Sequence, residues 1–265
     1  MMSKNSTRID DIIQFLENEK ELYGAFTPPD QSVKSVSIDA KPSAEEKQKS
    51  EPDNSPTEEA HEPKTTYQPQ LSLDERLKQC KTLDELRNLC AEAEELKTDL
   101  KNTNLVFGVG NPNADLMIIG EAPGQEEDKQ GEPFVGAAGQ LLNKILKAIE
   151  FERDDVYIAN ILKHRPPGNR NPSGEERQRS LPYLLRQIDL INPKIILCVG
   201  RVSGTTLLDR DDSLRNMRGS FHNFRGAKLT VTYHPAALLR NPEWKRPTWE
   251  DVQMVREKYY ELTGS

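Results

Sequence analysis

Four short apolar runs, separated by segments with a helical pattern, constrain the fold of this chain most strongly. Each run is too short for an ordinary helix and is apolar at consecutive positions, which is typical of a strand buried on both faces. The runs are LMIIG at 116–120, VYIANI at 156–161, IILCVG at 195–200 and LTVT at 229–232. Helical patterns occupy 137–150, 174–191, 202–208 and 247–262. Strands that alternate with helices predict an α/β domain with a mostly parallel sheet covered on both faces.

The N-terminal part of the chain lacks this alternation. Aliphatic residues at i, i+3, i+4 and i+7, starting at Ile9, predict a short amphipathic helix within residues 1–26. Its apolar stripe needs a surface to pack on, either the domain of the same chain or a partner protein. Residues 27–70 hold seven prolines and few large apolar side chains, which predicts a disordered linker. Residues 71–105 then form a helical lead-in, and 106–265 form the α/β domain.

The distribution of charge and cysteine narrows the class of protein. Residues 1–100 carry 13 basic and 22 acidic residues, whereas residues 101–265 carry 23 and 21, so the net charge of −7 belongs to the first part. The α/β domain is therefore free to bind nucleic acid. No apolar run approaches the ~20 residues of a membrane span, and the N-terminus has no secretory pattern. Three cysteines make no disulfide framework, so we expect a cytoplasmic protein with no membrane contact.

Polar side chains gather where the predicted strands end, the edge at which parallel sheets bind ligands. Two carboxylates, an aromatic ring, an amide and an imidazole together suit a pocket for a planar heterocycle. They are Glu121, Glu127, Phe134, Asn160 and His234. Taken singly, each has a plainer interpretation as a solvated charge, a core ring, a turn cap or a structural histidine. No Gly-x-Gly-x-x-Gly or Walker pattern is present, which argues against a dinucleotide or triphosphate site.

Three blocks of the sequence stand out: GEAPGxxED with GxPFVGxAG at 120–139, VYIxN with KxRPPGNRxP at 156–172, and HPAALLR at 234–240. In order and spacing they resemble the blocks of the family 4, or thermostable-type, uracil-DNA glycosylases. The resemblance runs from about Val106 to Glu261. It implies a three-layer α/β/α sandwich with a central four-stranded parallel sheet. It also implies a DNA repair enzyme that hydrolyses the N-glycosidic bond of uracil in DNA.

The resemblance assigns a role to each candidate residue of the base site. Gly120 lines the site, Phe134 stacks on the extruded uracil, and Asn160 reads its N3–H and O4. His234 bonds uracil O2 and stabilises the charge that develops as the bond breaks. One of Glu121 and Glu127 holds the attacking water, and we favour Glu127.

The same resemblance assigns residues that contact the DNA strand. Leu238 matches the residue that fills the gap left by the flipped base. Four basic residues are candidates for phosphate contacts, although each also has an interpretation as a solvated surface charge. They are Lys163, Arg165, Arg170 and Arg240.

The family's iron–sulphur cluster is held by four cysteines, and the chain departs from this pattern. The corresponding positions read Cys90, Ala93, His164 and Ser180. Because one cysteine is left, we predict no cluster, no metal and no other cofactor. A zinc site formed by Cys90 and His164 is the less favoured alternative, since two ligands fall short of the usual four. We expect packing and hydrogen bonds to join the segments that the cluster would join.

Three functions remain open at this point. The favoured one is a monomeric glycosylase whose partner is uracil-containing DNA. The second is a catalytically weak or inactive uracil- or DNA-binding member of the same superfamily. The third keeps the fold and changes the base that is excised. The amide of Asn160 favours uracil over other bases, because it complements the edge of that base.

Overall fold

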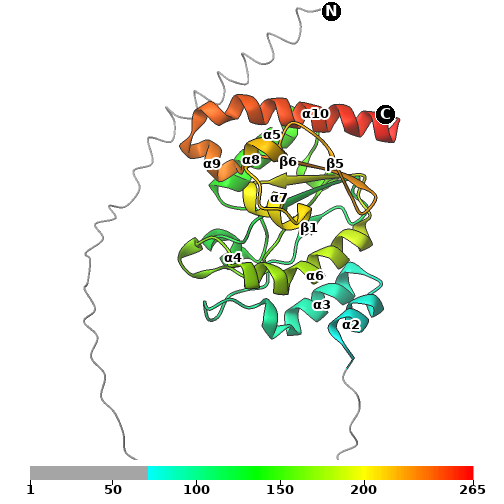
Figure 1. Cartoon of the computed structure of the whole chain (residues 1–265). Coiled ribbons are helices and arrows are strands. Elements are labelled where there is room, and N and C mark those ends of the chain that lie inside the picture. The colour runs from blue at the N-terminus through cyan, green and yellow to red at the C-terminus, as the bar shows by residue number, and fades with distance from the viewer. Residues whose placement is uncertain (1–70, 265) are drawn as a thin grey trace, which may run out of the picture. The chain divides into compact units, whose positions relative to one another are not determined.

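The computed structural model describes residues 71–264, which form a six-stranded sheet between layers of helices (Figure 1). The helix predicted within residues 1–26 and the linker predicted at 27–70 lie outside the described residues. The strand order is β1-β3-β2-β4-β6-β5. The strands are β1 (Val109–Gly110), β2 (Leu116–Gly120), β3 (Tyr157–Asn160), β4 (Ile195–Val199), β5 (His222–Phe224) and β6 (Ala227–Thr232).

The predicted α/β class and central parallel sheet are confirmed. The neighbours β3, β2, β4 and β6 are parallel to one another, and they correspond to the four apolar runs. The edge strands β1 and β5 are antiparallel to β3 and β6, and the sequence did not indicate them. With two and three residues, they are too short to carry a period-2 pattern.

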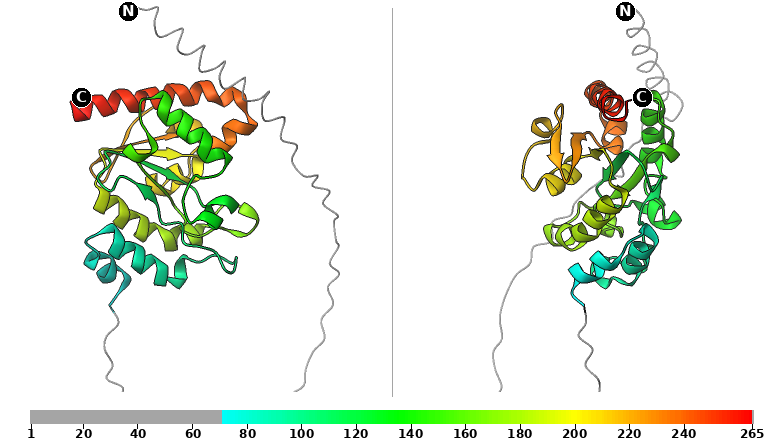
Figure 2. Two further views of the ribbon diagram at one scale, coloured as in Figure 1. Left: turned by 180° about the vertical axis from the view of Figure 1, so that it is seen from behind. Right: turned by 90° about the vertical axis from the view of Figure 1, so that its right-hand side faces the viewer.

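Helices cover both faces of the sheet, as Figure 2 shows from two further directions. Helices α5 (Ala137–Ala148) and α10 (Lys245–Thr263) pack on one face, while α6 (Gly174–Ile191) and α7 (Arg201–Leu208) pack on the other. Successive side chains of β2 alternate between these two cores: Leu116 and Ile118 face α5, and Met117 and Ile119 face α6. This alternation explains why every residue of the strand is buried.

The lead-in forms helices α2 (Leu73–Gln79) and α3 (Leu83–Glu92) and the short η1 (Glu94–Leu96). Capping boxes begin α2, α3 and α6, the latter two formed by Thr82 with Glu85 and by Ser173 with Glu176. The lead-in packs on α6 through an apolar cluster that includes Tyr183 and Phe107. It therefore shares a core with the α/β domain.

Short helices occupy the loops that connect the main elements. They are α4 (Gln125–Gln130), η2 (Arg153–Asp155), η3 (Pro167–Asn169), α8 (Leu214–Met217), α9 (Pro235–Arg240) and η4 (Pro242–Trp244). Helix α4 follows β2 and α9 follows β6, so both lie at the carboxyl end of the sheet (Figure 1). Among the helices of residues 71–264, none is both long and apolar enough to span a membrane.

Candidate active site

The candidate base site lies at the carboxyl end of the sheet, where the sequence predicts it. Gly120 and Asn160 end the neighbouring strands β2 and β3 and face each other in register. A β-carbon on Gly120 would overlap the Asn160 side-chain oxygen and lie 2.6 Å from the Phe134 ring. The amide and the aromatic ring therefore converge over Gly120, and the close approach requires a glycine there.

The ring of His234 completes this group. His234 follows β6, and its ring centroid lies 5.5 Å from that of Phe134 with 29° between the ring planes. We refer to Gly120, Phe134, Asn160 and His234 as the base site. Three separate segments of the chain thus bring together the stacking ring, the amide and the imidazole that the sequence analysis singled out.

Phe134 sits in a strained loop that its surroundings hold in place. Its φ of 53° is in the left-handed region, which is unfavourable for a residue with a side chain. Arg153 donates a hydrogen bond of 2.6 Å to the carbonyl of Pro133, immediately before it. Gly139 packs so closely on the Phe134 backbone that a β-carbon would overlap it. Such strain persists where several contacts fix the backbone, and it holds the ring in position before any ligand arrives.

Glu127 is the main clamp of this loop. Its carboxylate accepts hydrogen bonds from the backbone N–H groups of Val135 and Gly136, both at 3.0 Å, and of Gly124 at 3.2 Å. Both carboxylate oxygens are therefore engaged with the loop that carries Phe134. This arrangement argues against our preference for Glu127 as the residue that holds the attacking water. Its negative charge still lies close enough to His234 to raise the pKa of that ring.

Glu121 is the less engaged of the two carboxylates. It follows directly after β2, it is half-buried, and within residues 71–264 no hydrogen bond to its carboxylate is present. Burial raises the pKa of Glu121, and the nearby Arg177 partly opposes this. A carboxylate in this environment has free acceptor sites and an increased affinity for a proton. Sequence analysis missed Arg177, because nothing in the α6 pattern distinguishes it from a solvated charge.

His234 is held as a neutral hydrogen-bond donor. Its Nδ1 accepts a hydrogen bond of 3.1 Å from the backbone N–H of Ala236, in the first turn of α9. The remaining proton of a neutral ring must then sit on Nε2. Burial, together with the charge of Arg240, lowers the pKa of His234 to about 4, although the charge of Glu127 partly opposes both. The ring is therefore uncharged at neutral pH.

Asn160 presents an acceptor without a partner. The residue is 2% exposed, and its Oδ1 is buried with no hydrogen-bond partner among the described residues. A buried polar atom in this state costs about 1–3 kcal/mol, so native proteins rarely leave one unpaired. Because Oδ1 lies against the Phe134 ring at Gly120, a ligand donor in the base site would satisfy it.

The structure argues against two of the predicted DNA contacts. Lys163 is completely buried and its ammonium group is bonded inside the protein, so it cannot reach a phosphate. Leu238 is 2% exposed, while its neighbour Leu239 is 52% exposed on the same short helix. A leucine that enters DNA must be accessible, which makes Leu239 the candidate. The sequence alone does not show which of these two neighbouring leucines faces the core, because both are apolar and the helix is short.

The other basic candidates differ in their exposure and in the hydrogen bonds that their guanidinium groups already form. Arg240 is exposed at the end of α9, and Arg165 is half-buried with its Nε bonded to Asn169. Arg170 is exposed, but its guanidinium forms two hydrogen bonds with Glu176, at 2.7 and 2.9 Å. This ion pair fixes Arg170 against the start of α6. Arg240 and Arg165 therefore remain the better candidates for phosphate contacts.

The four positions that correspond to cluster cysteines are all buried, and we call them the lead-in junction: Cys90, Ala93, His164 and Ser180. Ser180 donates a hydrogen bond of 2.6 Å to the carbonyl of Ile161, and Nδ1 of His164 lies 3.0 Å from the Thr103 hydroxyl. Cys90 and Ala93 pack in the apolar cluster of the lead-in. Burial raises the pKa of the Cys90 thiol to about 12.

These residues do not fit an iron–sulphur cluster. Ala93 has no donor atom, and the side chains of His164 and Ser180 are already engaged with protein groups. Within residues 71–264, no group of three or more His, Cys, Asp or Glu side chains gathers in a way that would hold a metal ion. Hydrogen bonds and apolar packing join the lead-in to the loop after β3 and to α6.

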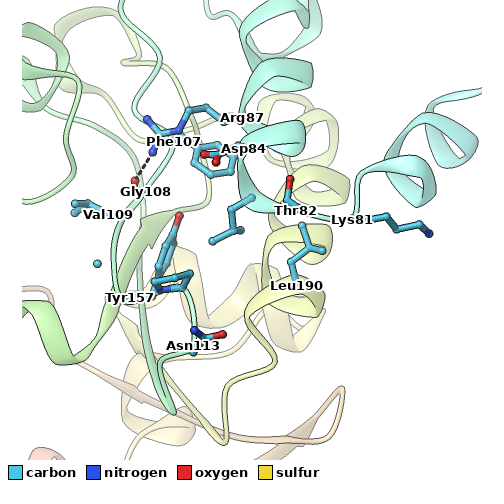
Figure 3. Close-up of a pocket in the computed structure, with 13 residues that line it drawn as sticks. Lys81, Thr82, Asp84, Arg87, Phe107, Gly108, Val109, Asn113, Tyr157 and Leu190 are labelled. Carbon is cyan, nitrogen blue, oxygen red and sulfur yellow. Dashed lines mark hydrogen bonds between the residues drawn. The ribbon is translucent and has the colours of Figure 1, made fainter.

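A separate cavity of about 490 Å³ lies beside the edge strand β1, between α3, β1 and the end of α6 (Figure 3). Its walls include Arg87, Phe107 and Tyr157. None of the candidate site residues lines it, so it is distinct from the base site. The ring of Phe134 and the amide of Asn160 are almost fully buried, so little of the base site is open to solvent in this conformation.

Comparison with known proteins agrees with this geometry. The family model for the uracil DNA glycosylase superfamily matches residues 107–253. A type-4 uracil-DNA glycosylase of Archaeoglobus fulgidus is 39% identical over 176 residues, which cover 63% of this chain and 87% of the relative. One of Saccharolobus solfataricus is 45% identical over 163 residues, which cover 58% and 76%. A DNA polymerase of Bacillus phage SP01 is 29% identical over 155 residues, 58% of this chain but 17% of the polymerase. With a family match over more than half of its length, the chain belongs to the uracil DNA glycosylase superfamily.

Proposed function

We propose that this protein is a uracil-DNA glycosylase, which hydrolyses the N-glycosidic bond of uracil in DNA, releases free uracil and leaves an abasic site. The observation that carries the proposal is the unpaired, buried Oδ1 of Asn160 beside the Phe134 ring and the neutral His234. The type-4 uracil-DNA glycosylases among its relatives support the same activity. Such an enzyme acts in base excision repair.

Asn160 accounts for the choice of base. Its Oδ1 accepts the N3–H of uracil, and its side-chain NH₂ donates to O4. Cytosine presents an acceptor at N3 and a donor at the exocyclic amine, so both contacts would be mismatched. A site built around such paired groups rejects the wrong base strongly, because the mismatched base leaves the buried amide unpaired. Phe134 supplies the stacking face for the flipped base.

His234 and Glu127 stabilise opposite charges of the transition state. As the glycosidic bond breaks, its electron pair moves onto uracil and the sugar acquires oxocarbenium character. The Nε2–H of neutral His234 donates to O2 and stabilises the uracil anion without transferring its proton. The carboxylate of Glu127, held by three backbone N–H groups, provides a fixed negative charge near this site.

Glu121 is the residue that we propose holds the attacking water. Its carboxylate has free acceptor sites, and its raised pKa favours accepting a proton. Glu121 takes a proton from water as the oxygen bonds to the sugar carbon, and the electron pair of the broken bond leaves with uracil. The uracil anion then takes up a proton from solvent. Glu127 keeps the positioning role that its hydrogen bonds indicate.

The DNA strand is gripped by the exposed end of α9 and by the loop after β3. Leu239 fills the gap left by the flipped base, since its side chain is 52% exposed. Arg240 and Arg165 contact phosphates on either side of it. Arg170 acts mainly through its ion pair with Glu176.

We also propose that the protein works without an iron–sulphur cluster or any other cofactor. The support is the lead-in junction, in which one cysteine remains and two of the other three side chains bond to protein groups. Iron analysis of the purified protein tests this, and stoichiometric iron would contradict it. A monomeric state and a cytoplasmic location remain predictions from the sequence.

The activity is tested with a synthetic oligonucleotide that contains one uracil. Incubation with the protein followed by alkaline treatment should cleave the strand at that position, while a cytosine control stays intact. The Asn160→Ala and His234→Ala variants should lose most of this cleavage. Intact uracil strands at high protein concentration would refute the proposal, and tight binding of those strands without cleavage would support the alternative of an inactive binding protein.

A further inference from the structure

We propose that Lys163 is a positioning residue that fixes the base-reading Asn160 from behind, through a hydrogen bond to its backbone carbonyl. This inference rests on the proposed function, in which Asn160 reads uracil. It replaces the phosphate contact that the sequence suggested for Lys163.

All three donors of the Lys163 ammonium group have an acceptor inside the protein. Its Nζ donates to the carbonyl of Asn160 at 3.1 Å, to the carbonyl of Phe107 at 3.1 Å and to Oε1 of Gln187 at 2.7 Å. An ammonium group has three N–H donors, so each donor has one acceptor. The acceptors come from the end of β3, from the segment before β1 and from α6.

The acceptors are themselves oriented by further hydrogen bonds. The side-chain nitrogen of Gln187 donates to the hydroxyl of Tyr157 at 2.9 Å and to the carbonyl of Phe107 at 3.2 Å. Tyr157 and Asn160 are the first and last residues of β3. The network therefore runs along the α6 side of β3, from the wall of the cavity in Figure 3 to the base site.

The charge of Lys163 is difficult to explain as a device for stability. Lys163 is 0% exposed, and no carboxylate pairs with it among the described residues. Burying a charge carries a large desolvation penalty, which an apolar residue of similar volume would avoid. An apolar residue could not hold three acceptors in fixed directions. We therefore infer that the network positions the backbone and side-chain groups that it bonds.

Asn160 is the residue for which this geometry matters. Fixing its carbonyl fixes the direction of its Cα–Cβ bond, and the side-chain amide has little freedom beyond that because it packs against Gly120 and Phe134. The unpaired Oδ1 is thus held where uracil N3–H would meet it. Displacing a substrate-positioning group such as this amide by about 1 Å is enough to lower the reaction rate strongly.

The test is a double-mutant cycle between Lys163→Met and Asn160→Ala, measured as uracil excision under single-turnover conditions. Methionine is unbranched and one atom shorter than lysine, and it lacks the charge and the donors. We expect Lys163→Met to lower kcat/KM by about 10- to 100-fold and to weaken inhibition by free uracil by a similar factor. The melting temperature should fall, because the carbonyls of Phe107 and Asn160 and the side chain of Gln187 lose a buried donor, so excision is measured at a temperature where the variant is folded. In the Asn160→Ala background, Lys163→Met should change kcat/KM by less than about twofold, because the residue through which it acts is gone.

Lys194→Met is the matched control, because it makes the same substitution on an exposed lysine at the opposite end of the sheet. It should leave excision unchanged. If Lys163→Met does not fold, Tyr157→Phe provides the second variant, since it removes only the hydroxyl that orients Gln187. It should cause a smaller loss, about threefold, that likewise disappears in the Asn160→Ala background.

Two results would overturn the inference. One is a Lys163→Met protein with the wild-type kcat/KM and the wild-type inhibition by uracil. The other is an equal fold loss with and without Asn160, from either variant, which would mean a general structural effect. Failure of the proposed function looks different, because the unaltered protein would then release no uracil before any variant is compared.

Discussion

The base site and the lead-in junction differ in how their buried polar atoms are paired. In the base site, Oδ1 of Asn160 has no partner among the described residues, and the neutral His234 keeps its Nε2 proton for an external acceptor. In the lead-in junction, the hydroxyl of Ser180 and Nδ1 of His164 are engaged within the protein. Unpaired polar atoms lower stability and are retained where a ligand satisfies them. The comparison therefore separates residues that act on a substrate from residues that hold the fold.

The largest expected effect is that of His234→Ala. Losing the donor to uracil O2 should lower kcat by about 10²–10³-fold, as for other donors that stabilise a developing anion. The melting temperature should fall modestly, since the cap of α9 and the stacking on Phe134 are lost. Single-turnover excision and thermal unfolding measure the two quantities. Nearly normal excision by this variant would remove His234 from the chemistry.

Exchanging Glu121 and Glu127 for glutamine should separate their two roles. Glu121→Gln should lower kcat about 10²-fold through loss of the base, with an unchanged free energy of unfolding. Glu127→Gln should destabilise the fold by about 2 kcal/mol, because charged hydrogen bonds to the Phe134 loop are lost. Urea unfolding alongside excision assays distinguishes them. The reverse pattern would restore Glu127 as the residue that holds water.

The two leucines of α9 offer a third comparison. Leu239→Ala should lower excision from double-stranded DNA about tenfold and from single strands less, because a single strand has no base stack to fill. Leu238→Ala should instead destabilise the protein by about 2–5 kcal/mol, as for a buried leucine. Equal loss on both kinds of DNA would contradict the role of Leu239.

As the pH falls, Glu121 should take up a proton before His234 does. Burial raises the pKa of Glu121 above its ordinary value of 4.5, so kcat should fall first as this carboxylate takes up a proton. His234 has a pKa of about 4 and stays neutral until lower pH. Its contribution to stability is complete above the unfolded value of 6.5 and is lost as the pH falls toward 4. In Glu121→Gln, the residual activity should stay level until the pH nears 4, and an unchanged acid limb would contradict this order.

The smallest effect on activity is expected in the lead-in junction. Ser180→Ala removes the hydroxyl that donates to the buried carbonyl of Ile161, which should cost about 1–3 kcal/mol of stability. The kcat/KM for uracil should stay within about twofold at a temperature where the variant is folded. A large loss of kcat without a loss of stability would mean that the junction takes part in catalysis.

Much of the fold and the convergence of the base site could be predicted from the sequence. The parallel strands are apolar on both faces, so β2 and β4 are recognisable as uninterrupted runs. The carboxyl ends of parallel strands meet at one edge, which is why Gly120, Asn160 and His234 come together although they are distant in the sequence. Periodicity and strand topology carry this information by themselves.

What could not be predicted depends on which atoms meet in three dimensions. Lys163 looks like a surface charge in the sequence, and only the placement of Phe107 and Gln187 around it makes it a buried donor. The two carboxylates of the first block are alike in the sequence, and the backbone of the Phe134 loop decides that Glu127 is the clamp. For the lead-in junction, the sequence led us to expect packing and hydrogen bonds, but it did not indicate which groups would form them.

The most direct measurement is a crystal structure of the protein with free uracil bound. The account predicts that uracil stacks on Phe134, with its N3–H bonded to Oδ1 of Asn160 and its O2 bonded to Nε2 of His234. Uracil bound in the cavity beside Phe107 and Tyr157, with Oδ1 of Asn160 still unpaired, would contradict it.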